Sequence, residues 1–163
     1  MRRIAPRSWP LPLKAVALVA LLAAPALAAP YIPSTPDLGK AEGRCRADEG
    51  GPAILVEPVG LKDRAGLLKL EVYPANDADF LRDDNLLVAE GKTFRRVEVS
   101  AASTAPICIR VPGPGSYALM LLHDRDANRK FGFSIDGVGF RAIPTLAGAS
   151  PRLPARGSRP AAG

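Results

Sequence analysis

Residues 67–73 read LLKLEVY, and apolar side chains alternate with charged ones along most of this stretch. Leu68, Leu70 and Val72 would therefore share one face of a half-buried β-strand. Residues 116–122 (SYALMLL) are almost continuously apolar, which is typical of a central strand covered on both faces. The two stretches together favour a sheet protein over a helical one.

The chain around these two stretches alternates short strand-like segments with turn signals. Further strands are expected at residues 54–59, 93–100 and 105–111. One helical turn is expected at residues 76–81, where Asn76 or Asp77 can cap it. No segment has the apolar period of a long helix, so we predict an all-β sandwich.

Residues 1–28 have the composition of a secretory signal peptide. Four cations and no acid accompany an apolar core at residues 15–24, which is too short to span a bilayer. Small residues at Ala26 and Ala28 predict cleavage before Ala29, and an uncleaved N-terminal anchor is the alternative. We therefore expect a periplasmic or secreted protein with no transmembrane segment after the signal.

The net charge is +6, and the pI of about 9.7 would ordinarily suggest nucleic acid as a partner. Four of the 22 cations lie in residues 1–28 and four in residues 141–163, and neither segment contains an acid. Residues 29–140 hold 14 cations and 16 acids and are close to neutral. No stretch interleaves aromatic and basic side chains as a base-stacking surface would, so we expect no nucleic-acid partner.

Cys45 and Cys108 are the only thiols, and export would place them in an oxidising compartment. A structural disulfide between them would close a loop of 63 residues and contribute about 4 kcal/mol in the chain-entropy model. Free thiols or a redox-active pair are disfavoured because no C-x-x-C spacing exists, and too few ligands remain for zinc.

The loop that follows the central strand contains a candidate calcium site. Asp124, Asp126 and Asn128 have the alternate spacing with which a calcium loop begins, and Asp136 could add an oxygen. The match is incomplete, because Arg129 occupies the position at which the sharp turn wants glycine. The alternative is a set of Asx turns, in which these side chains bond their own backbone.

His123 is the only histidine, and as a general base it would need a nucleophile and an orienting acid. Its neighbour Asp124 would point to the opposite face of a strand, so it cannot orient the imidazole. No phosphate-binding glycine loop and no G-x-S-x-G motif occur. We therefore expect that the protein is not an enzyme and that it needs no cofactor, calcium excepted.

Three motifs, LLKLEVYP at 67–74, SYALMLLHD at 116–124 and DGVGF at 136–140, resemble the exported bacterial family called domain of unknown function 2141 (DUF2141). The resemblance covers residues 53–140 and implies a small immunoglobulin-like or transthyretin-like β-sandwich; it brings no activity. Members commonly have glycine where this chain has Arg129. They also continue with a last strand, whereas residues 141–163 are rich in Ala, Pro and Arg.

The chain therefore divides into a signal peptide (1–28), an extended arm (29–49), a β-sandwich (50–140) and an irregular tail (141–163). We expect the tail to be disordered or to be the product of a reading-frame change. The predicted function is an exported, non-enzymatic module with a structural or binding role in the cell envelope, where its partner is an unidentified envelope protein or polysaccharide. The alternative is a calcium-assisted carbohydrate or ligand binder that uses residues 124–130, with Phe131, Phe133 and Phe140 available to stack on sugar.

Overall fold

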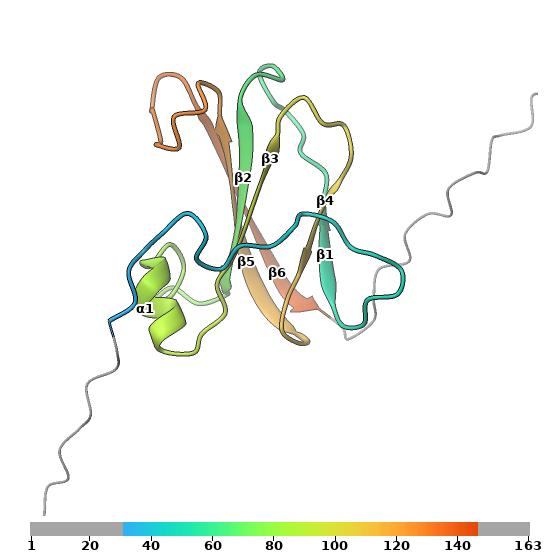
Figure 1. Ribbon diagram of the computed structural model, residues 1–163, viewed down its shortest axis with the longest axis vertical. Helices are drawn as coiled ribbons and strands as arrows, with labels where there is room; N and C mark the ends of the chain where they lie inside the picture. Colours follow the sequence, from blue (N-terminus) through green and yellow to red (C-terminus); the bar gives the residue numbers. More distant parts are fainter. Residues whose placement is uncertain (1–30, 147–163) are drawn as a thin grey trace, which may run out of the picture.

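The computed structural model describes residues 31–146, which form two antiparallel sheets (Figure 1). A four-stranded sheet has the order β3-β2-β5-β6, and a two-stranded sheet pairs β1 with β4. The elements are β1 (Ala53–Val56), β2 (Leu67–Pro74), α1 (Asp84–Ala89), β3 (Arg95–Ser100), β4 (Ile107–Arg110), β5 (Gly115–Asp124) and β6 (Gly137–Leu146). The predicted all-β fold is confirmed.

The main core lies between the two sheets. Leu70 of β2 sits opposite Val97 of β3 on one side and Leu121 of β5 on the other, so the sheet presents one apolar face. Ile107 and Ile109 of β4 pack against that face from the second sheet. The alternation seen in residues 67–73 therefore identified the correct inward face of β2, and β5 is central as predicted.

Part of the opposite face of the four-stranded sheet is covered as well, by the segment that contains α1. Tyr73, Leu87 and Phe94 form a second buried cluster there. Sequence did not predict α1, because six residues are too few for a helical period to show. The turn expected at residues 76–81 is present, and the Asn76 side chain accepts a hydrogen bond from the Asp79 N–H at 3.0 Å, as a cap does.

Residues 35–49 form the arm, which closes one side of the sandwich. The Ala41 N–H donates to the carbonyl of Arg96 in β3 at 2.7 Å, and the Cys108 N–H of β4 donates to the Gly43 carbonyl at 3.0 Å. The predicted disulfide between Cys45 and Cys108 is present, with a Cα–Cα distance of 5.6 Å. The arm thus covers the outer edges of both β3 and β4.

The sequence-based end of the domain at residue 140 is wrong. β6 continues to Leu146 in antiparallel register with β5, and Ala142 and Ile143 lie opposite Ala118 and Tyr117. An edge strand needs a partner on one side only, so a composition poor in β-formers is tolerated, and Pro144 is accommodated next to an irregularity in the register. An irregular tail beginning at residue 141 is therefore excluded.

The signal peptide expected at residues 1–28 and the remainder of the tail, residues 147–163, lie outside the described residues. Among residues 31–146, no helix has the length and apolar character needed to cross a membrane.

Candidate functional site

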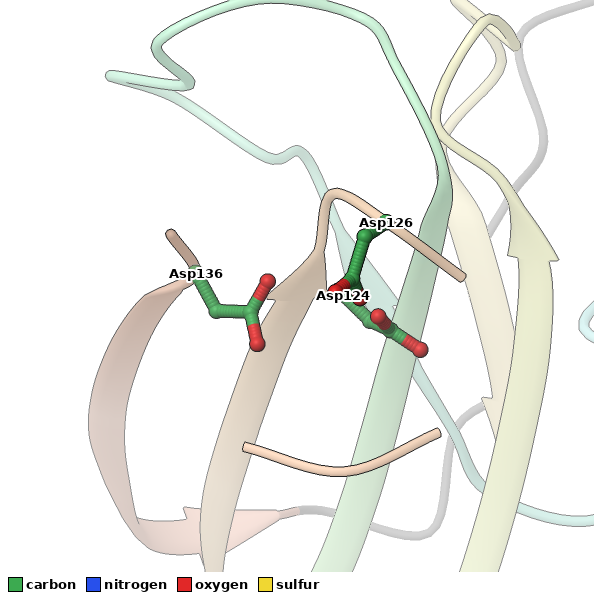
Figure 2. A group of neighbouring side chains, drawn as sticks. All are labelled: Asp124, Asp126 and Asp136. Atoms are coloured by element: carbon green, nitrogen blue, oxygen red, sulfur yellow. The ribbon is translucent and has the colours of Figure 1, made fainter. Parts of the chain in front are cut away.

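The loop between β5 and β6 brings three carboxylates together (Figure 2). Asp124 ends β5 and is almost fully buried, Asp126 is exposed in the loop, and Asp136 directly precedes β6. One ligand oxygen from each lies within 4.8 Å of the others. Of the predicted set, Asp124 and Asp126 are thus joined by Asp136, whereas Asn128 uses its side-chain oxygen to accept the Lys130 N–H at 2.7 Å.

Each of these carboxylates already accepts hydrogen bonds from the loop backbone. Asp124 accepts the N–H groups of Asn128 and Arg129 at 3.2 and 2.7 Å. Asp136 accepts those of Gly132 and Arg125 at 2.7 and 2.9 Å, and these two bonds lower its pKa. The loop therefore has the Asx-type hydrogen bonding that the sequence offered as the alternative, and a cation would have to share oxygens that shape the loop.

The backbone conformation at Arg129 is one that favours glycine. Its φ of 62° lies in the left-handed region, which costs energy for a residue with a side chain. The guanidinium compensates in part by pairing with Glu98 of β3 at 2.9 Å. Arg129 thus ties the loop to β3, the edge strand on the far side of β2, and its positive charge lies near Asp124 of the acidic cluster.

The His123 side chain is 3% exposed, and its contacts hold the local structure together. Its Nε2 lies 2.9 Å from the Ala65 carbonyl, and the Asp63 carboxylate is 3.8 Å away. Asp63 also pairs with Arg125, which together with the Ala65 N–H lowers the pKa of Asp63 to about 2. In the described part of the chain, no hydroxyl or thiol hydrogen-bonds to the imidazole as a nucleophile would.

A buried ionic cluster on the outer face of β2 and β3 was not found from the sequence. Arg96 Nε lies 2.8 Å from Glu71, which is 3% exposed, and Arg96 Nη2 lies 2.9 Å from Asp84 of α1. Tyr73 donates to Glu71 at 2.7 Å, and burial, with the nearby Glu71 charge, raises the pKa of Tyr73. The sequence contains opposite charges at Glu71 and Arg96, but these two residues are recognised as a pair only when the register of β2 and β3 is known.

The phenylalanines considered for sugar stacking are exposed rather than part of the core. Phe133 is 92% exposed and contacts Phe131 edge-on, with ring centroids 6.3 Å apart. Phe140 of β6 is 58% exposed and contacts Phe80. Phe131 and Phe140, with Leu81 and Val138, border a shallow apolar hollow over β5 and β6.

Strands β2 to β6 and the β5–β6 loop lie within a region of the chain that matches a known protein family. A family described as "Uncharacterized protein conserved in bacteria (DUF2141)" matches residues 56–153. The match includes the three motifs quoted above and runs past Phe140, as β6 does. No curated protein and no solved structure matches the chain. Because the family match covers more than half of the 163 residues, the chain belongs to this bacterial family.

Proposed function

We propose that the protein is an exported, non-enzymatic β-sandwich with a structural or binding role in the cell envelope. The observation that carries the proposal is the bond between Cys45 and Cys108, which fixes the arm across the sheets. Such a structural disulfide persists in oxidising compartments. The signal-like composition of residues 1–28 supports the same location.

The test is fractionation of cells that express the full chain, followed by mass spectrometry of the protein with and without reduction. We expect a chain that begins at Ala29 in the periplasm or medium, with both cysteines resistant to alkylation until reduced. A full-length chain with two alkylatable thiols in the cytoplasm would contradict export. Envelope proteins or polysaccharides captured by the purified protein, with or without a chelator, would then identify its partner.

The second candidate is a calcium-assisted carbohydrate or ligand binder. The convergence of Asp124, Asp126 and Asp136 beside exposed Phe131 and Phe133 favours it. Calorimetric titration with calcium should then release or absorb heat and raise the melting temperature, and Asp126→Asn should abolish both effects. Asp77→Asn, at an exposed acid outside the loop, is the control. No heat and no shift at millimolar calcium would discard this candidate.

A further inference from the structure

The two sides of the sandwich are closed to different extents. On one side the arm covers the edges of β3 and β4. On the other side, within residues 31–146, β1 pairs with β4 alone and β6 pairs with β5 alone. One edge of each sheet is therefore left without a backbone partner in the described chain. Unpaired edges are templates for pairing with another chain.

The register shows which backbone groups of β1 point outward. In an antiparallel pair, successive residues direct their N–H and C=O groups alternately toward and away from the partner. The Val111 N–H reaches Pro52 at 3.2 Å, whereas the Cys108 N–H points the other way, to Gly43 at 3.0 Å. Leu55 lies opposite Cys108, so its own N–H and C=O point away from β4, into the open edge.

An apolar groove of about 590 Å³ runs alongside this edge, between β1 and β6. Leu119 and Leu121 of β5 line it, with Ile143 of β6 and Ile54 of β1. Gly139 of β6 also faces the groove, and a Cβ placed there would meet no atom within 4 Å. The groove therefore exists because a strand position next to β1 is unfilled and because Gly139 contributes no side chain.

The charge at the groove narrows the chemistry of its occupant. The groove is lined by one charge of each sign, Glu57 just after β1 and Arg141 of β6, so an acid is favoured only beside Arg141. Arg141 lies opposite Leu119, on the face that lines the groove, and no ion pair or hydrogen bond engages its guanidinium within the described residues. An acidic side chain would complement it. The segment at residues 147–163 carries arginines and no acid, so it lacks that complement.

We propose that this groove and the free edge of β1 bind an extended segment of a partner protein. The segment adds as a strand to β1 through the backbone groups of Leu55, places apolar side chains from alternate positions in the groove, and directs an acidic side chain to Arg141. The inference deepens the proposed binding role and rests on it. It does not depend on which compartment the protein occupies, so failure of the binding test and failure of the export test are distinguishable.

The test uses the purified full chain and a phage-displayed library of random dodecapeptides. We expect selected peptides to have apolar residues at alternate positions and at least one acid. Gly139→Ile should abolish binding of the synthesised peptides because its side chain fills the groove. Leu55→Pro should weaken binding about tenfold, since it removes a donor that points away from β4 and leaves the pairing with β4 intact.

A matched control separates the groove from general damage to the fold. Val138→Ile adds bulk to the same strand on its opposite face, outside the groove. Val138→Ile should bind as the wild type does, and circular dichroism should show all three variants folded. Gly139→Ile alone decides the question if Leu55→Pro does not fold.

Three results would overturn the proposal. One is a selection that enriches no peptide, or peptides that bind Gly139→Ile unchanged. Another is binding of dodecanoate that Gly139→Ile blocks and Leu55→Pro does not affect, without peptide binding, which would assign the groove to a fatty acid. The third is a dimer in sedimentation equilibrium that Leu55→Pro dissociates, which would make a second copy of the chain the occupant.

Discussion

Replacing Gly66 by alanine should destabilise the protein strongly, because this glycine is required for two separate reasons. Its φ of 74° lies in the left-handed region, and a Cβ there would stand 2.0 Å from the Asp124 carbonyl oxygen. The obstacle is main chain at the end of the central strand β5, which cannot rotate away as a side chain could. The substitution therefore requires the strand or the turn before β2 to move.

A control in the same β1–β2 connection separates the cost of the left-handed backbone from the cost of the steric clash. Gly60 has a φ of 70°, but a Cβ there would meet nothing within 4 Å. Gly60→Ala should cost about 1 kcal/mol, because the left-handed penalty is partly offset by lower entropy of the unfolded chain. Gly66→Ala carries the same terms plus a steric displacement of about 2 kcal/mol or more, so its total should exceed about 3 kcal/mol.

Urea unfolding followed by circular dichroism measures the free energy of unfolding that each substitution removes. Equal m-values in the two variants and the wild type would show that the unfolding transition itself is unchanged. Chemical shifts of Asn128 and Arg129 should also change in Gly66→Ala, since their N–H groups bond Asp124. Equal destabilisation by the two substitutions would refute the reasoning, because the close approach of Gly66 to β5 would then cost nothing.

Three further changes probe the arm, the ionic cluster and the loop. The double substitution Cys45→Ser and Cys108→Ser should lower the free energy of unfolding by about 2–4 kcal/mol, measured in urea. A reductant should lower the free energy of unfolding of the wild type by the same amount and should leave that of the variant unchanged. Arg96→Ala should cost about 3 kcal/mol, because it leaves the buried Asp84 without its cation and leaves Glu71 with Lys69 alone, 3.3 Å away, whereas Arg95→Ala should cost less than about 1 kcal/mol. The pKa of Asp63 is lowered to about 2, so its ionised form stabilises the fold above the unfolded pKa near 4, and that contribution disappears as the pH falls through 2. Melting temperatures of the wild type should therefore fall more steeply between about pH 4 and pH 2 than those of Asp63→Asn, and parallel curves would contradict the assignment.

The sequence predicted the inward face of β2 and the central place of β5 because a sheet with one core face imposes a period of two. The same period places Glu71 on the opposite, more polar face but does not predict that Glu71 is buried there. The segment that contains α1 covers that face at Glu71, and Arg96, Tyr73 and Lys69 pair with the buried carboxylate. Tyr73 shares this face of β2 through its spacing of two residues, but Arg96 cannot be identified before the pairing of β2 with β3 is known.

The candidate metal site shows a second limit of predictions made from the spacing of residues in the sequence. Alternate positions placed Asp124, Asp126 and Asn128 together, as they would be in a regular calcium loop. In the structure the chain turns at Ala127 and Arg129, both with positive φ, and Asp136 returns to the cluster from the start of β6. The sequence offered Asp136 as an additional ligand, but its return to the cluster depends on the pairing of β5 with β6, and a local motif contains no information about that pairing.

The open side of the sandwich differs from an unprotected sheet edge, and the difference supports selective docking. β1 is only four residues long and is followed by Pro58, while β6 has an irregular register near Pro144; short strands, prolines and irregularities all restrict indiscriminate pairing. What these features leave accessible is the short stretch around Leu55, directly above an apolar groove. An occupant must therefore satisfy a few backbone groups and the groove together, which a general aggregating edge would not require.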